Sequence, residues 1–386
     1  MVNALPLTWD EQGVAHAARW QSASGAPLPK RVRVVDDTLN ADTAYKLACE
    51  GHALLWRGDY HQARQMLTAL AHRIDKARAR RKLAAAPLGP AQAFHQHRKA
   101  QAERARILGL LVMALDGQHT LALRRAPESV KAAAQAAIGE QTGPYVVSLR
   151  ELLGWMGAWE WRQVGVAVPA LGGACIHPHY GVYSPVRGEY LDLLAEAPLP
   201  PALKAHGLAY DIGTGTGVIA ALLARRGAAR VVATDVQATA LANAMETVQA
   251  LGLQHRVELQ SADLFPLGSE RAALIVCNPP WLPARPSSPI EAAVYDPESR
   301  MLRGFLEGLG ARLVPGGEGW LILSDLAEHL GLRSRAELEG WIAGAGLRVL
   351  GRLDTRPRHG KAQDAGDPLH AARKREVTSV WRLGAA

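Results

Sequence analysis

Three alternating glycines, Gly213, Gly215 and Gly217, stand between the apolar run 208–212 and a helical pattern that begins at residue 218. Glycine lets a backbone turn sharply and approach a ligand closely, and the start of a helix offers free N–H groups. Residue 218 is valine, so the Gly-x-Gly-x-x-Gly spacing of nicotinamide dinucleotide sites is not met. The loop therefore predicts a ligand site and disfavours a nicotinamide-dependent oxidoreductase.

Two aspartates follow the next two apolar runs. Asp235 ends the run 230–235, and Asp263 comes shortly after the run 256–260. A carboxylate at the carboxyl end of a parallel strand can accept hydrogen bonds from both hydroxyls of a ribose, and we expect this role for Asp235, although an aspartate there can also cap the following helix. We expect Asp263 to accept a hydrogen bond from the exocyclic amine of a purine. Together with the glycine loop, these acids predict a nucleoside site.

A fourth apolar run, 273–277, leads into Asn278-Pro279-Pro280-Trp281. Neither proline has an N–H to donate and both stiffen the loop, so the Asn278 side-chain oxygen and the Pro279 carbonyl can both point outward as acceptors. Two acceptors that face one point suit a planar –NH2 group and draw its lone pair out of conjugation. The Trp281 ring can cover the flat face of such a group, and base–aromatic stacking contributes about 1–3 kcal/mol. A loop plug is the alternative role for this tryptophan.

The elements that would position these residues alternate from about residue 176 onward. Short apolar runs alternate with amphipathic helical patterns, which is typical of a parallel sheet with helices on both faces. Only loop separates the last two strands, so we expect these two to pair antiparallel. Seven strands are predicted, near 207–212, 230–235, 256–260, 272–277, 318–324, 346–353 and 376–383.

Residues 176–383 resemble the class I S-adenosylmethionine-dependent methyltransferases of the amino-methylating branch, which carry [Asn/Asp]-Pro-Pro-aromatic. This branch includes HemK-type protein-glutamine methyltransferases and the enzymes that methylate adenine N6 or guanine N2 in DNA and RNA. The resemblance implies an α/β fold with a Rossmann-like, seven-stranded methyltransferase sheet whose last strand is antiparallel. It also implies that S-adenosyl-L-methionine is the cofactor and that the protein is a methyltransferase.

The resemblance further implies roles for individual residues. The glycine loop would lie at the methionine end of the cofactor, and Asp211, just before it, would contact that end. Asp235 would bind the ribose and Asp263 the adenine. The catalytic tetrapeptide would be Asn278, Pro279, Pro280 and Trp281, with Asn278 also beside the cofactor. The reaction needs no metal, and we expect none.

Four residues are expected on the substrate side. Tyr183 and Arg187 lie in a segment that resembles the one closing over the cofactor in HemK-like members, and Arg285 and Arg358 belong to a basic mouth beside Trp281. A basic mouth beside a stacking tryptophan fits a nucleic acid, so we predict N-methylation of an exocyclic base amine, in RNA rather than DNA. The alternatives are a protein glutamine as acceptor, as in HemK enzymes, and a non-catalytic nucleic-acid-binding module.

Two departures from the HemK pattern disfavour glutamine as the acceptor. Trp281 stands where those enzymes usually have tyrosine, and the part before the catalytic domain is longer than theirs. We expect a mostly helical N-terminal domain at 1–170, possibly for substrate recognition, and the catalytic domain at 171–386. Within the first, 44–74 predicts two helices joined at residues 57–59. The arginine-rich run 73–106 suits either a phosphate-binding surface or a solvated helix face.

Composition sets the broader limits. The 386 residues are 48% hydrophobic and 21% charged, as in folded soluble proteins, and carry a net charge of +8, which favours acidic partners. The three cysteines are too few and too scattered for a disulfide framework. Neither a membrane-spanning run nor a signal-peptide pattern is recognisable. We therefore expect a cytoplasmic protein that does not bind membranes; no feature of the sequence indicates its oligomeric state.

Overall fold

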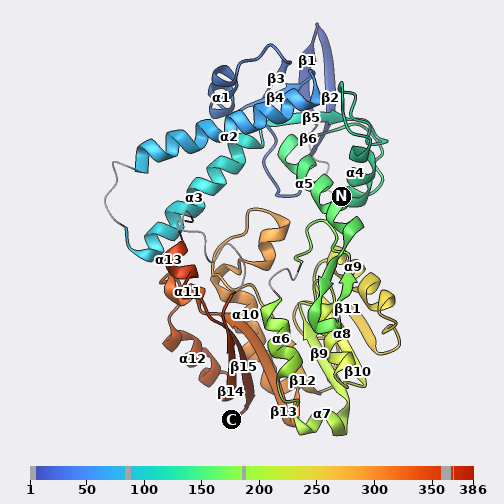
Figure 1. Ribbon diagram of the computed structural model, residues 1–386, viewed down its shortest axis with the longest axis vertical. Coiled ribbons are helices and arrows are strands. Elements are labelled where there is room, and N and C mark those ends of the chain that lie inside the picture. The colour runs from blue at the N-terminus through green and yellow to red at the C-terminus, as the bar shows by residue number, and fades with distance from the viewer. Residues whose placement is uncertain (1–5, 83–87, 185–187, 358–366, 368) are drawn as a thin grey trace. The chain divides into compact units, whose positions relative to one another are not determined.

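The computed structural model describes residues 6–82, 88–184, 188–357, 367 and 369–386. The chain divides into two units, residues 1–160 and 161–386, each with more contacts inside it than outside. The sequence placed this boundary at residue 170. Figure 1 shows a sheet flanked by helices in each unit. Among the described residues, no helix combines the length and apolar character needed to cross a membrane.

The second unit contains a seven-stranded sheet in the order β11-β10-β9-β12-β13-β15-β14 (Figure 1). The seven predicted strands are confirmed, and β13 begins five residues earlier than expected. The strands are β9 (Leu208–Ile212), β10 (Arg230–Asp235), β11 (Val257–Ser261), β12 (Ala272–Cys277), β13 (Leu313–Ser324), β14 (Leu347–Thr355) and β15 (Thr378–Ala385).

Strand β15 is the antiparallel one. It pairs antiparallel with both β13 and β14, whereas β9 to β13 pair parallel with one another. The parallel strands run in the same direction, so their carboxyl ends meet at one edge of the sheet. The loops that follow β9, β10, β11 and β12 therefore come together, and these loops carry the residues that the sequence singled out.

Helices cover both faces of this sheet. Because successive residues of a strand point to opposite faces, Ala209 and Tyr210 belong to different apolar clusters. The cluster around Ala209 includes side chains of α6 (Glu189–Glu196), α7 (Pro201–His206), α8 (Val218–Arg225) and α9 (Ala238–Ala250). The cluster around Tyr210 includes side chains of α10 (Arg300–Arg312) and α12 (Arg335–Gly344). This is the predicted two-sided covering.

Shorter elements complete the second unit. The hairpin β7–β8 stands before α6, and the remaining helices join the strands at the carboxyl edge. Their bounds are β7 (Val166–Val168), β8 (Ala174–Ile176), η1 (Pro169–Leu171), η2 (Pro289–Ala293), η3 (Pro297–Ser299), α11 (Leu326–His329) and α13 (His370–Arg373).

The first unit contains a six-stranded mixed sheet in the order β1-β2-β6-β5-β4-β3. Its strands are β1 (Leu7–Glu11), β2 (Val14–Gln21), β3 (Arg31–Val35), β4 (His52–Trp56), β5 (Leu111–Leu115) and β6 (Tyr145–Ser148). Its helices are α1 (Ala41–Cys49), α2 (Tyr60–Lys82), α3 (Pro90–Leu108), α4 (Ser129–Ile138) and α5 (Leu149–Val164). Helical residues outnumber strand residues, as the sequence predicted, but the sheet was not predicted.

The predicted pair of helices over 44–74 is wrong in its first half. Helix α1 ends at Cys49, Gly51 adopts a φ of 87°, and the next residues form strand β4. Residues 53–56 are all buried, because β4 lies between β3 and β5 in the sheet. A short, continuously apolar run does not distinguish a buried strand from a buried helix by its periodicity.

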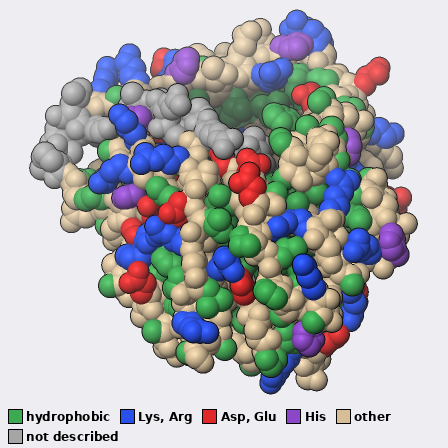
Figure 2. Space-filling view, turned by 60° about the horizontal axis from the view of Figure 1, so that its bottom comes forward, with side chains coloured by type: hydrophobic (Ala, Val, Ile, Leu, Met, Phe, Trp, Pro, Cys, Tyr) green, Lys and Arg blue, Asp and Glu red, His purple; other side chains and the backbone are tan. Residues whose placement is uncertain are grey.

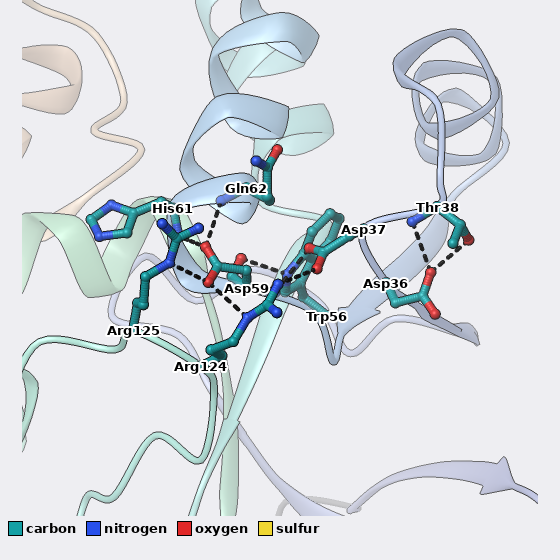
Figure 3. A network of polar contacts seen from close by, with 9 residues as sticks. All are labelled: Asp36, Asp37, Thr38, Trp56, Asp59, His61, Gln62, Arg124 and Arg125. Carbon is teal, nitrogen blue, oxygen red and sulfur yellow. Dashed lines mark hydrogen bonds and ion pairs between the residues drawn. The ribbon is translucent and has the colours of Figure 1, made fainter.

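A buried carboxylate organises the turn between β4 and α2 (Figure 3). Asp59 accepts hydrogen bonds from the backbone N–H groups of His61 and Gln62, at 2.9 and 3.3 Å, and so caps α2. Its other oxygen accepts from Arg125 Nε at 2.6 Å and from Arg124 Nε at 3.2 Å. The hydrogen bond from Arg125 holds the pKa of Asp59 far below its usual range. This network fixes the turn that the sequence recognised as a helix start.

Candidate active site

The glycine loop after β9 requires glycine for two different reasons. Gly213, Gly215 and Gly217 have φ values of 74°, 55° and 79°, a region that other residues adopt with strain. A Cβ at Gly213 would lie 2.6 Å from the Cε atom of Met301, and one at Gly217 would lie 3.0 Å from the Cα atom of Ala244. A Cβ at Gly215 would meet no atom within 4 Å and would point into open space. Gly215 is thus the position at which a ligand can approach the backbone.

Asp235 links the end of β10 to this loop. Its carboxylate accepts hydrogen bonds from the backbone N–H groups of Gly215, at 3.1 Å, and Gln237, at 2.9 Å. Both oxygens retain a lone pair that faces the cavity described below. The side chain thus caps the turn into α9 and remains able to bind a ligand, so the two roles that the sequence left open are compatible.

Asp211 is fully buried beneath the glycine loop. Its Oδ2 atom accepts hydrogen bonds from Thr214 Oγ1 at 2.6 Å and from the backbone N–H of Ala220 at 3.0 Å, whereas its Oδ1 atom has no partner. Burial raises the pKa of Asp211 to about 7, and the negative charge of Asp235 adds to the increase. A buried carboxylate oxygen without a partner is costly unless a cation or donor reaches it.

Asp263 is held by an arginine that the sequence did not single out. Arg300 donates from both terminal nitrogens to the two carboxylate oxygens of Asp263, and both side chains are more than half exposed. The two residues are 37 positions apart in the sequence, and α10 brings them together. An adenine amine would therefore share an Asp263 oxygen with Arg300 rather than meet a free carboxylate.

The Asn-Pro-Pro-Trp turn begins where β12 ends. The indole N–H of Trp281 donates a hydrogen bond to Asn278 Oδ1 at 3.0 Å. Pro279 is buried, whereas Asn278, Pro280 and Trp281 are half-buried and line the cavity. Burial raises the pKa of the Tyr190 phenol, and a contact with the Asn278 side chain opposes this effect. The sequence did not single out Tyr190.

The loop after Trp281 is tied back at its base. Leu282 N–H donates to the Val294 carbonyl at 3.1 Å, and Asp296 N–H donates to the Leu282 carbonyl at 2.8 Å. The buried Asp296 carboxylate accepts from the N–H groups of Met301, at 2.9 and 3.0 Å, and Leu302, at 3.1 Å, at the start of α10. Asp296 thus connects this loop to the helix that packs on the glycine loop.

These residues surround one cavity of about 670 Å³, within the range of about 300–1,000 Å³ usual for small-molecule sites. Of the predicted site residues, it is lined by Tyr183, Gly213, Gly215, Asp235, Asp263, Asn278, Pro280 and Trp281. Asp211, Gly217 and Pro279 are buried next to these residues in the chain. Residues of the lining that the sequence did not single out include Tyr190, Arg300, Met301, Leu326, Leu369 and Arg373.

The predicted basic mouth is only partly described. Arg285 is exposed on the loop after Trp281 and is not among the described residues that line the cavity. Arg187 and Arg358 lie outside the described residues. Arg373 does line the cavity, and its Nε atom forms an ion pair with Asp367 at 2.8 Å.

Comparisons with known proteins agree with this geometry. Residues 176–328 match the model of the methyltransferase small domain. A release factor glutamine methyltransferase of Cereibacter sphaeroides is 36% identical over 163 residues, which cover 38% of this chain and 56% of that protein. The second unit belongs to the class I S-adenosylmethionine-dependent methyltransferases. The family that the sequence motifs indicated is thereby confirmed.

Other relatives of this methyltransferase act on different acceptors. A ribosomal protein L11 methyltransferase of Sorangium cellulosum is 29% identical over 237 residues, which cover 56% of this chain and 67% of that protein. A tRNA1(Val) (adenine(37)-N6)-methyltransferase of Phocaeicola vulgatus is 42% identical over 72 residues, 18% of this chain and 31% of that protein. The chain spans about half the length of the release factor methyltransferases that it matches.

The residues of the cavity fit S-adenosylmethionine, the cofactor of this family. The orphan oxygen of Asp211 can accept from the ammonium group of the methionine end, and the open side of Gly215 leaves room for the ligand. The free lone pairs of Asp235 can accept from ribose hydroxyls. A dinucleotide would instead require a glycine at position 218, which is valine.

Proposed function

We propose that the protein is an N-methyltransferase that modifies the side-chain amide of a glutamine in a protein. One observation carries this proposal: Asn278 and Trp281 line the same cavity as Gly215 and Asp235. A methyl donor held by the glycine loop and a planar amide held by Asn278 would therefore meet in one enclosure. Confinement of two reactants in this way removes much of the entropic barrier to their reaction.

The binding half of the site is built from β9, β10 and β11. Asp211 would neutralise the ammonium group of the cofactor, Asp235 would bind the ribose, and Asp263, steadied by Arg300, would accept from the adenine amine. When bound, S-adenosylmethionine supplies an electrophilic methyl group on a sulfonium centre. These residues hold that methyl group at a fixed distance from β12.

The acceptor half is the Asn278 turn. A carbonyl oxygen has two lone pairs; one of those on Asn278 Oδ1 is occupied by the Trp281 indole, and the other remains for an acceptor N–H. The Pro279 carbonyl would accept the second N–H. Both bonds localise the lone pair on the acceptor nitrogen. A nitrogen–carbon bond then forms as the sulfur–carbon bond breaks, and the nitrogen releases one proton.

The choice of glutamine departs from the preference that the sequence alone suggested. The relatives named release factor glutamine methyltransferases match 115–163 residues at 34–40% identity, which supports an amide acceptor more than the charge of the mouth supports a base. The exocyclic amine of a nucleic-acid base is the second candidate. The half-buried indole of Trp281 favours it, because an indole can stack on a base.

Transfer of a labelled methyl group distinguishes these acceptors. The protein is incubated with methyl-labelled S-adenosylmethionine and cell extract from a strain that lacks its gene, and the products are digested separately with protease and RNase. We expect protease-sensitive label that acid hydrolysis releases as methylamine, because hydrolysis of an N-methyl amide frees the amine. Label that RNase releases as a methylated nucleoside would support the second candidate instead.

The matched control is Asn278→Ala, which should bind S-adenosylhomocysteine normally but transfer no label. If the wild-type protein labels neither fraction while binding the cofactor, the proposed activity is wrong, and the non-catalytic module that the sequence left open takes its place.

A further inference from the structure

The net positive charge of the protein is concentrated in one helical hairpin of the first unit. Residues 60–108, which contain α2 and α3, include eleven lysines and arginines but only two acidic residues, a net charge of +9. The whole chain carries +8, so the other residues together carry −1. Without Arg81 and Lys82, whose side chains lie outside the described structure, the hairpin still carries +7.

The hairpin keeps much of this charge exposed. Helices α2 and α3 pack against each other (Figure 1). Arg73 pairs with Asp42, and Arg104 with Asp75. Five further cations are exposed and form no ion pair with a described residue: Arg64, Lys76, Arg80, Lys99 and Arg106. By contrast, basic and acidic side chains are interspersed over most of the face shown in Figure 2.

The spacing of these cations places them in rows. Lys76 and Arg80 are one turn apart on α2, and Lys99 and Arg106 are two turns apart on α3, so each pair shares a helix face. One turn advances about 5.4 Å along a helix. Each helix thus presents repeated positive charges along its length, as a protein that follows a phosphate backbone does.

The apolar side of the hairpin is already used. The large apolar side chains Met66, Leu70 and Ile74 of α2 and Phe94 of α3 are buried. Among the described residues of the hairpin, Leu88 is the large apolar side chain that is exposed. A helix that lies on a membrane needs an apolar face to insert, so the free faces of α2 and α3 suit a soluble polyanion rather than a lipid surface.

We propose that the α2–α3 hairpin binds the phosphate backbone of a nucleic acid. The contact is electrostatic and independent of base sequence, because the exposed cations recognise phosphates rather than base edges. This surface belongs to the first unit and does not depend on the identity of the methyl acceptor. It gives the protein a place to dock on RNA or DNA even when the methylated group belongs to a protein.

The test compares two variants with the same loss of charge. In Lys76→Gln/Arg80→Gln/Lys99→Gln/Arg106→Gln, four exposed cations of the hairpin are neutralised. In Lys30→Gln/Arg31→Gln/Arg33→Gln/Lys131→Gln, four exposed cations elsewhere in the first unit are neutralised. Binding of a folded RNA and of a DNA duplex is measured by fluorescence anisotropy between about 50 and 200 mM salt, the range over which phosphate contacts change affinity most clearly.

We expect the hairpin variant to bind more than about tenfold more weakly than wild type and to lose about three to four units of salt slope, roughly one per phosphate contact. The control variant should change affinity less than about threefold. Comparable affinity of wild type for RNA and duplex DNA supports a backbone contact.

Three results would overturn the proposal: equal weakening in both variants, an unchanged salt slope in the hairpin variant, or no binding of either nucleic acid by wild type. Circular dichroism and S-adenosylhomocysteine binding by both variants establish that they are folded. Cofactor binding also separates this proposal from the proposed methyl transfer, because the hairpin variant should retain it.

Discussion

The indole N–H of Trp281 donates a 3.0 Å hydrogen bond to Asn278 Oδ1, across the two prolines that separate these residues. This bond sets the orientation of the Asn278 amide, because only its oxygen can accept from an indole. The remaining lone pair then points to a fixed place in the cavity. A tyrosine at position 281 has no N–H to make the same bond.

Trp281→Phe tests this positioning role. The variant keeps an aromatic face but loses the indole N–H, so we expect kcat to fall about tenfold, which corresponds to about 1.4 kcal/mol, while KM changes less than about threefold. Trp281→Ala should also raise KM, because it removes stacking worth about 1–3 kcal/mol. Steady-state kinetics with the labelled acceptor fraction measures both constants.

The matched control for this prediction is Trp341→Phe, the same change on α12. Its effect on kcat should be less than about twofold, since Trp341 is not among the residues that line the cavity. If Trp281→Phe retains the wild-type kcat, the hydrogen bond to Asn278 has no part in catalysis.

Asp211→Asn should separate cofactor binding from folding. The asparagine oxygen can still accept from Thr214 and Ala220, but an –NH2 group replaces the orphan oxygen that would meet the cofactor's ammonium group. We expect S-adenosylmethionine to bind more than about tenfold more weakly, the loss typical of a charged hydrogen bond. Isothermal titration calorimetry measures the affinity, and circular dichroism checks the fold.

The pH dependence of binding follows from the same carboxyl group. Burial raises the pKa of Asp211 to about 7, so the unliganded protein holds it protonated below pH 7. Only the ionised form attracts an ammonium group, and wild-type affinity should therefore fall toward about tenfold per pH unit as the pH drops below 7. The Asn variant should lack this slope; a wild-type affinity that is flat from pH 5.5 to 7 contradicts the assigned role.

Stability should change in the opposite direction to binding. The pKa of Asp211 is higher in the folded state than its ordinary value of 3.8, so this group favours the folded state at low pH, and that contribution is lost as the pH rises from about 4 through 7. At pH 8 the unliganded Asn variant should therefore be more stable than wild type, by on the order of a few kcal/mol. Urea unfolding at pH 5 and pH 8 measures the difference.

The sequence predicted the catalytic sheet well because its signals are local. The seven strands are short apolar runs with polar residues at their carboxyl ends, and parallel pairing brings those ends to one edge. Asp235 and Asn278 were found because each directly ends or follows such a run. In the first unit, β4 was missed because its four consecutive buried residues have no helical or strand period.

Contacts between distant residues were beyond the reach of the sequence. Asp263 was predicted to meet the cofactor alone, but its pairing with Arg300 depends on where α10 begins. The contact of Tyr190 with Asn278 depends on how α6 packs against the end of β12. The Trp281–Asn278 bond is only three residues long, yet it depends on the side-chain rotamers that the turn permits.

Gly215→Ala tests the open side of the glycine loop. At a φ of 55° an alanine is strained by about 1–2 kcal/mol, and its methyl group would stand where the ligand approaches. We expect a loss of S-adenosylhomocysteine affinity of at least tenfold together with this modest loss of stability. Calorimetry and thermal unfolding measure the two effects.

Gly252→Ala provides the matched comparison. Gly252 has a φ of 68°, and a Cβ there would also meet no atom within 4 Å, but the residue is not among those that line the cavity. It should lose similar stability and keep full cofactor affinity. Equal loss of affinity in the two variants would show that backbone strain, rather than ligand contact, explains the effect at Gly215.

Asp296→Ala tests whether the start of α10 supports the cavity. Asp296 accepts from the N–H groups of Met301 and Leu302, and loss of such a cap costs about 0.5–2 kcal/mol. Met301 packs against Gly213, so we expect cofactor affinity to fall as well, by several-fold. Asp296→Asn keeps an acceptor oxygen and should restore most of both losses.

Ser334→Ala removes a helix cap of the same kind at α12, where Ser334 accepts from the Glu337 N–H at 3.1 Å. This control should lose about the same free energy of unfolding but bind the cofactor normally, because Ser334 is not among the residues that line the cavity. If Asp296→Ala also binds normally despite its lower stability, then Asp296 holds the fold alone, and the wall formed by Met301 does not depend on it. If only Asp296→Ala loses affinity, the loop after Trp281 and the glycine loop are coupled through one buried carboxylate.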